Sequence, residues 1–129
     1  MRRRTTLVAA SAAMLLAGSA RAHHDMTALF DLQDKVIITG TLAKVDWRNP
    51  HIEMVVDVDV DAQQLTWAIE GPAPAFFRTR DPGRADVVAA ITQRVTAEVS
   101  RARDGSRLGL LRVMNLPGGK VLSACPQNC

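Results

Sequence analysis

The chain has 129 residues and a mass of 14.0 kDa, which corresponds to a single domain. Charged residues make up 22% and apolar residues 47%, which excludes a disordered tail and a fibre. The first 22 residues carry four arginines and no acid, so the formal charge of +3 arises there. The rest of the chain has 12 of the 16 basic and all 13 acidic side chains, a net charge of −1. This balance argues against nucleic-acid binding by a basic surface.

Residues 1–22 are typical of a cleavable secretory signal peptide. A basic start precedes an apolar run from Leu7 to Ala17, and Ala20-Arg21-Ala22 fits the small-x-small rule for cleavage after Ala22. The run is shorter than the roughly 18 apolar residues of a membrane anchor. We therefore expect a periplasmic or secreted bacterial protein, not inserted in the membrane after cleavage, with a single small domain at residues 23–129.

The mature part is predicted to begin with three strands. Val36–Trp47 is rich in β-branched residues, and Gly40 is expected to form a bulge or bend within it. His51–Asp61 alternates between apolar and polar residues, and Leu65–Glu70 repeats the alternation. A period of two indicates half-buried strands.

A helical interval and two or three further strands follow. Ala75–Ile91 has a helix-compatible composition and is expected to hold at least one short helix. Arg94–Ala102 alternates again, and Asp104-Gly105 is a hairpin signal leading into Leu108–Leu116. Lys120–Ser123 is an optional sixth strand.

This order of elements predicts an all-β fold, mainly β with one short helix. Three strands, a helix and two further strands are the arrangement of a small OB-like barrel, with the helix between the third and fourth strands. We expect five to six strands. An open β-sandwich is the alternative, because sequence alone rarely fixes topology.

Several short motifs recur together in a known family. The most specific are Trp47-Arg48-Asn49-Pro50-His51 and Trp67-Ala68-Ile69-Glu70-Gly71. In combination with His23-His24 and Arg103-Asp104-Gly105-Ser106, they make residues 23–122 resemble the small exported bacterial proteins of domain-of-unknown-function family 6152. The Cys-Pro-Gln-Asn-Cys tail is not part of that pattern. The resemblance implies a periplasmic single-domain β protein, and it implies no activity.

The three histidines all belong to the mature part, and two stand at its expected start. With cleavage after Ala22, His23 would offer its α-amine and ring Nδ1 to one metal as a chelate. An imidazole from His24 or His51 would complete a copper-type ligand set. Cleavage after Ala20 would instead place His23 third, the spacing of a square-planar Cu(II) or Ni(II) site. The alternative is that the terminal histidines are only solvated, and that His51 only shapes a loop.

Two carboxylates and the only two cysteines complete the candidate site residues. Glu53 shares the polar strand face with His51, and Glu70 ends the third expected strand, so each could orient a ligand histidine through a hydrogen bond. An ordinary solvated glutamate is the alternative. Cys125 and Cys129 could close a small disulfide ring in an oxidising compartment. The alternatives to this disulfide are unpaired or intermolecular thiols, or a thiolate metal clip.

Enzyme signatures are absent from the sequence. It contains no Gly-x-Ser-x-Gly elbow, phosphate-binding glycine loop or His-Glu-x-x-His motif. A binding protein is therefore expected rather than an enzyme. The first functional hypothesis is a carrier or accessory protein that binds copper or another transition metal through His23, His24 and His51. The second is a metal-free periplasmic adaptor that docks another envelope protein.

Overall fold

The computed structural model describes residues 26–129. The expected signal peptide at residues 1–22 lies outside the described residues, as do His23 and His24. Among the helices of the described part, none combines the length and the apolar character needed to cross a membrane.

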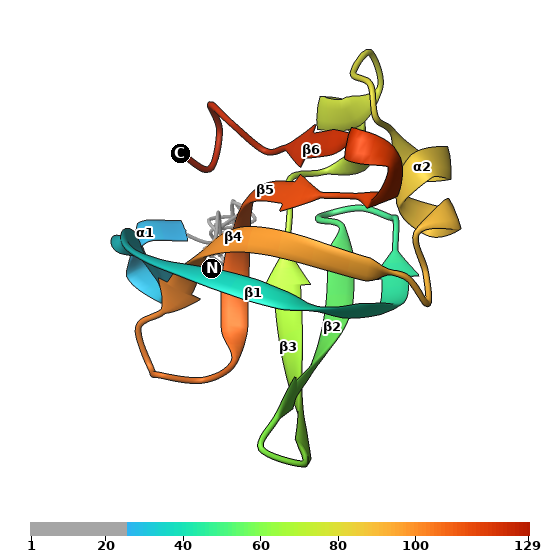
Figure 1. The fold of residues 1–129 in the computed structure, drawn as a ribbon. Coiled ribbons are helices and arrows are strands. Elements are labelled where there is room, and N and C mark those ends of the chain that lie inside the picture. Colours follow the sequence, from blue (N-terminus) through green and yellow to red (C-terminus); the bar gives the residue numbers. More distant parts are fainter. Residues whose placement is uncertain (1–25) are drawn as a thin grey trace, which may run out of the picture.

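Six strands and several short helical segments make up the fold (Figure 1). Helix α1 (Met26–Leu29) leads directly into the long strand β1 (Phe30–Asp46). The remaining strands are β2 (Glu53–Val60), β3 (Gln63–Glu70), β4 (Arg94–Ala102), β5 (Leu108–Asn115) and β6 (Val121–Ser123). Between β3 and β4 lie the 3₁₀ helix η1 (Pro74–Phe77) and helix α2 (Arg84–Ala89), and η2 (Pro117–Gly119) separates β5 from β6.

The strands form one sheet that curls into a near-closed ring. Their order is β3-β2-β1-β4-β5-β6, and β3 also pairs in parallel with β5, between Ala68–Glu70 and Leu108–Leu110. This second pairing joins the two ends of a five-strand ring, with β6 added on β5. The structure confirms the mainly β prediction and the OB-like order, with α2 between the third and fourth strands. The ring is not formally a closed barrel, and one sheet replaces the two sheets of a sandwich.

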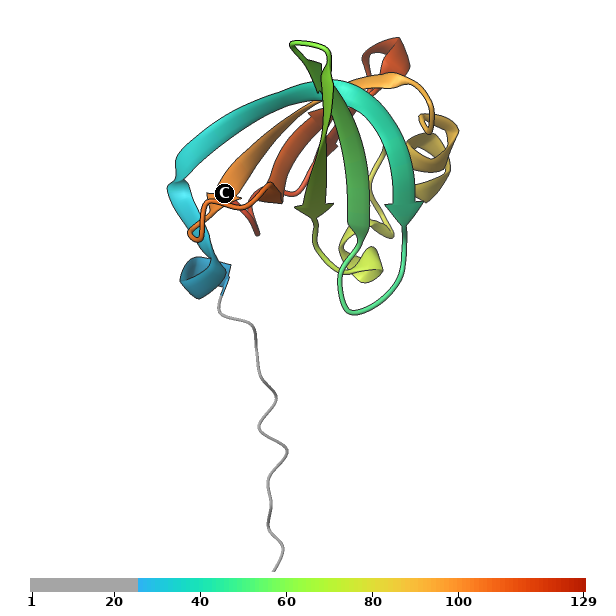
Figure 2. The same cartoon turned by 90° about the horizontal axis from the view of Figure 1, so that it is seen from below.

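Strand β1 pairs with both β2 and β4 and arches across the ring in Figure 2. Its register shifts between Asp31 and Lys35 and again between Leu42 and Lys44. The irregularity expected at Gly40 therefore lies a few residues further along the chain. Gly40 itself stays in the ladder, opposite Val95.

Strand β2 ends one residue earlier than expected. Asp61 and Ala62 have φ values of 47° and 65° and form a two-residue turn, after which Gln63 pairs with Val60. A positive φ at both central residues is typical of a tight β-hairpin. Asp61 therefore belongs to the turn and not to the strand.

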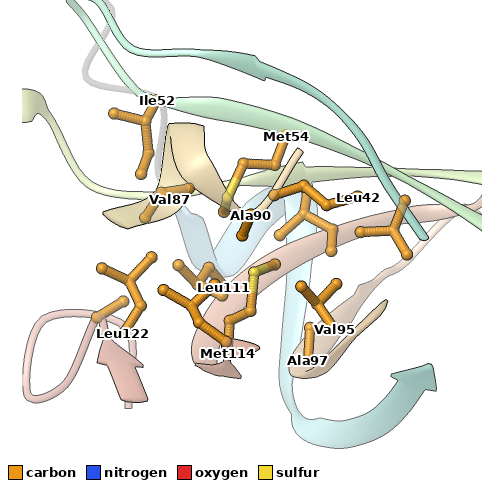
Figure 3. Packing of buried hydrophobic residues seen from close by; sticks show 14 of the residues in the cluster. Leu42, Ile52, Met54, Val87, Ala90, Val95, Ala97, Leu111, Met114 and Leu122 are labelled. Carbon is orange, nitrogen blue, oxygen red and sulfur yellow. The ribbon is translucent and has the colours of Figure 1, made fainter. Parts of the chain in front are cut away.

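The main core fills the ring and is closed on one side by α2 (Figure 3). Its fully buried side chains come from every strand of the ring and from the helix; they include Leu42, Met54, Val56, Ile69, Val87, Val95, Ala97, Leu111 and Met114. Both tryptophans, Trp47 and Trp67, are partly buried against this core. Burial of these apolar surfaces is the main force that holds α2 on the ring.

A smaller cluster lies on the opposite face of β5. Leu110 precedes Leu111 of the main core and points the other way, because side chains alternate along a strand. Leu110 is buried with Phe30 and Ala102, and Met26 of α1 packs against the three. The described chain thus begins on the outer face of the ring, beside β5.

Candidate functional site

The loop between β1 and β2 is clamped to the end of β3 by two backbone hydrogen bonds. The Gly71 amide donates to the Ile52 carbonyl at 2.8 Å, and the Ile52 amide donates to the Pro72 carbonyl at 3.1 Å. The Ile52 side chain is fully buried, and a Cβ on Gly71 would lie 2.7 Å from its Cγ1. Only glycine allows this close approach, so the clamp fixes where His51 stands.

His51 and Glu70 form a hydrogen-bonded pair at this point. The distance between His51 Nδ1 and Glu70 Oε1 is 2.6 Å, and the two side chains are 28% and 21% exposed. When Nδ1 carries the ring proton and donates it in a hydrogen bond to the Glu70 carboxylate, Nε2 keeps its lone pair free for a metal ion. A histidine held in this way has the tautomer and orientation of many metal-ligand histidines.

Three carboxylates form a row across the outer face of the sheet. Asp46 is the register partner of Glu53, and Glu53 is the register partner of Glu70. Side chains directly opposite in this way have Cβ atoms about 4.5–5.5 Å apart, and like charges so placed repel. Arg48 pairs with Asp46 at 2.6 Å, and His51 pairs with Glu70. Glu53, between them, is exposed and has no ion pair within the described chain.

The start of the described chain lies one strand away from this row. Glu70 on β3 is the register partner of Leu110 on β5, and Leu110 belongs to the outer cluster against which Met26 packs. Met26 therefore packs on the face of the sheet that carries the His51–Glu70 pair.

The outcome for the predicted metal ligands is mixed. The structure brings His51 and Glu70 together. Glu53 lies on β2, opposite Glu70 on β3, and forms no hydrogen bond or ion pair with His51 in the described chain. Between residues 26 and 129, no group of three or more His, Cys, Asp or Glu side chains gathers at a spacing that could hold a metal ion. A complete site would need ligands from outside this range.

Cys125 and Cys129 are joined in a disulfide, with their Cα atoms 5.1 Å apart. The small loop packs on β5, because the buried Asn128 side chain donates to the Leu111 carbonyl at 3.1 Å. Arg112 Nη1 donates in turn to the Asn128 carbonyl at 3.3 Å. In this state the two sulfurs are not available as a thiolate clip.

Sequence reasoning did not identify Asp46 as a member of the acidic row. The signal was present, because Asp46 is the last acidic residue before the Asn49-Pro50 turn and Glu53 is the first charged residue after His51. A strand that ends and one that begins across a short loop place such residues opposite each other.

The comparisons with known proteins identify a family but no activity. A family of unknown function, DUF6152, matches residues 11–112, and the chain therefore belongs to it. The match ends within β5, so β6 and the disulfide loop follow it in the chain. Comparison with the curated proteins and with the solved structures finds no match.

Proposed function

We propose that this member of the DUF6152 family is an exported protein that binds a transition metal, with copper as the preferred ion, and acts as a carrier or accessory protein. In this proposal His51, oriented by Glu70, supplies one imidazole to a site that His23 and His24 complete. The 2.6 Å contact between His51 and Glu70 is the observation that carries it.

The length of chain before Met26 supports the shared site. His23 stands three residues before Met26, and three extended residues span about 10 Å. Met26 itself packs on the outer cluster that adjoins Glu70. The unpaired Glu53 adds negative charge beside the pair, which favours an approaching cation.

The export part of the proposal is supported by the signal-like residues 1–22 and by the disulfide. Disulfides persist in oxidising compartments such as the periplasm and are rare in the cytosol. The Cys125–Cys129 bond is therefore consistent with a periplasmic or secreted location.

The test is a Cu(II) titration of the exported, naturally cleaved protein by calorimetry and electron paramagnetic resonance. Glu70→Gln removes the charge that orients His51, and we expect it to weaken copper binding by about 10- to 100-fold. The matched control is Asp59→Asn, on the exposed far end of β2, which should leave the affinity unchanged. Affinity should also fall as pH drops through the imidazole range near ~6.5, because ligands must lose protons to coordinate.

Two outcomes would contradict the metal proposal. One is copper binding no tighter than that of an unstructured His-His peptide. The other is tight binding that survives the replacement of both His23 and His24 by alanine.

A metal-free adaptor that docks another envelope protein is the second candidate. It is favoured by the lack of a metal-ligand group between residues 26 and 129 and by the exposed apolar side chain of Ile37, which is 62% accessible on β1. If the protein does not bind copper in the titration, this surface becomes the candidate docking site. Ile37→Asp should then abolish docking of the partner without lowering the stability of the fold.

A further inference from the structure

A basic pocket lies where the end of β1, η1 and the start of α2 meet. Its volume is about 340 Å³, and its walls include Trp47, Phe77, Arg78, Arg80 and Arg84. Pockets that hold small molecules have volumes of about 300–1,000 Å³. The pocket therefore has room for a small ligand and lacks the extent of a polymer-binding groove.

Between residues 26 and 129, no carboxylate forms an ion pair with the arginines of this pocket. Of the nine arginines between residues 26 and 129, four pair with a carboxylate: Arg48, Arg101, Arg103 and Arg112. Three of the five others line this one pocket, and no carboxylate lines it. Asp86, two residues after Arg84 on α2, is already engaged by Lys120 and by the Gly83 amide. Uncompensated positive charge is thus concentrated at one place on a mature chain that is nearly neutral overall.

One of these guanidinium groups is held in place before any ligand arrives. Arg80 Nη1 donates to the carbonyl of Cys125 at 3.2 Å, and its guanidinium carbon lies 3.9 Å from the centre of the Phe76 ring. The disulfide loop and η1 therefore fix Arg80 between them. Preorganised groups of this kind lose less conformational freedom when a ligand binds.

The same pocket has an aromatic wall. The rings of Trp47 and Phe77 lie 5.2 Å apart at an interplanar angle of 50°, and Phe77 is anchored in the core. Trp47 is only partly buried, so part of its indole is free to contact a ligand. Aromatic faces favour flat apolar groups through stacking.

We propose that this pocket binds a small molecule in which an oxyanion, a phosphate or a carboxylate, is attached to a flat apolar group. The guanidinium groups of Arg78, Arg80 and Arg84 would pair with the oxyanion, because the planar fork of arginine matches phosphate and carboxylate geometry. The indole of Trp47 would contact the flat group. This site is separate from the His51–Glu70 pair and does not depend on metal binding.

The experiment titrates the exported protein with phenyl phosphate and with benzoate, which separate the two oxyanions. Inorganic phosphate and phenol are titrated separately as controls, because each represents one half of phenyl phosphate. Because the chain has two tryptophans, a proton–nitrogen correlation spectrum contains two indole signals. We expect phenyl phosphate or benzoate to shift the Trp47 signal in a saturable way and to leave Trp67, on β3, unchanged. Phenol alone should not bind, and added salt should weaken binding.

Matched arginine variants locate the site. Arg78→Gln and Arg84→Gln should each weaken binding about tenfold, as expected for the loss of one charge-assisted hydrogen bond. Arg107→Gln is the control, since Arg107 is also exposed and has no carboxylate partner within the described chain but lies in the loop between β4 and β5. All three side chains are exposed, so the variants should fold.

The proposal is overturned if neither probe binds in a saturable way, or if calorimetry finds the same affinity in the Arg78→Gln/Arg84→Gln double variant. It is also overturned if the probes shift the Trp67 signal and not the Trp47 signal.

Discussion

Gly40 is the position where a single missing side chain decides whether two strands can pair. A Cβ built on Gly40 would lie 2.2 Å from the Asp57 carbonyl oxygen and 3.0 Å from Val56 Cγ1. The nearest obstacle is backbone, which cannot rotate away as a flexible side chain would. Gly40 therefore allows β1 to approach β2 closely, just before the register shift at Leu42–Lys44.

We predict that Gly40→Ala lowers the free energy of unfolding by about 3 kcal/mol, because the added methyl must push β1 away from β2. Urea unfolding followed by tryptophan fluorescence measures the change. Gly83→Ala is the control, since its nearest contact would be the Arg80 carbonyl at 3.6 Å. If Gly40→Ala lowered the free energy of unfolding by no more than Gly83→Ala does, β1 would be able to move and accept a side chain.

Single residues of the site were predictable to different degrees. His51 and Glu70 could be found because His51 begins one clearly alternating segment and Glu70 ends another, inside the two most specific motifs of the sequence. The arginines of the basic pocket could not, because Arg78 and Arg80 lie in irregular chain before the Asp81-Pro82-Gly83 turn and Arg84 begins the short helix α2 directly after it. No periodicity tells which way side chains point in such a segment.

At the scale of the elements, the period-two pattern predicted strands where burial alternates. Arg94–Ala102 was predicted with its observed bounds, because Val95, Ala97 and Val99 alternate with polar residues. The first residues of β1 and helix α1 were not predicted. Phe30 pairs with Ala102, a contact between residues far apart in sequence that no local pattern reveals.

Helix α2 is tied to the chain after β5 by a charged pair that should respond to pH. The hydrogen bond from Lys120, and after it that from the Gly83 amide, hold the pKa of Asp86 below its ordinary value of 3.8. A carboxyl with a depressed pKa in the folded state stabilises the fold above its unfolded pKa, and this contribution is lost as the pH falls through the folded value.

We therefore expect Asp86→Asn to lower the melting temperature above about pH 5 and to lose this effect as the pH falls below about 4. Differential scanning calorimetry of the wild type and the variant across this range measures the difference. Asp59→Asn, an exposed carboxylate on β2, should show no such convergence. A melting-temperature difference that stays constant down to low pH would mean that Asp86 acts by packing and not by its charge.

For the whole molecule, closure of the ring and attachment of the helix are linked. The parallel pairing of β3 with β5 is short, and the interior it encloses is completed by Val87 of α2 and by Ala90, which directly follows the helix. A helix of six residues is too short to be stable alone in water. It forms only because the ring buries one of its faces, and the ring in turn needs that face to complete its core.

This mutual dependence predicts a sharp contrast between two neighbouring valines of α2. Val87 is fully buried and Val88 is 42% exposed, so the same substitution removes core packing at one position and surface contact at the other. Val87→Ala should lower the free energy of unfolding by about 2 kcal/mol, whereas Val88→Ala should change it by no more than about 0.5 kcal/mol.

Unfolding in urea is followed by far-ultraviolet circular dichroism for the strands and by tryptophan fluorescence for the core. Because the helix and the ring are one cooperative unit, both signals should shift together in Val87→Ala. A shift in fluorescence alone would show that α2 detaches from a ring that stands without it.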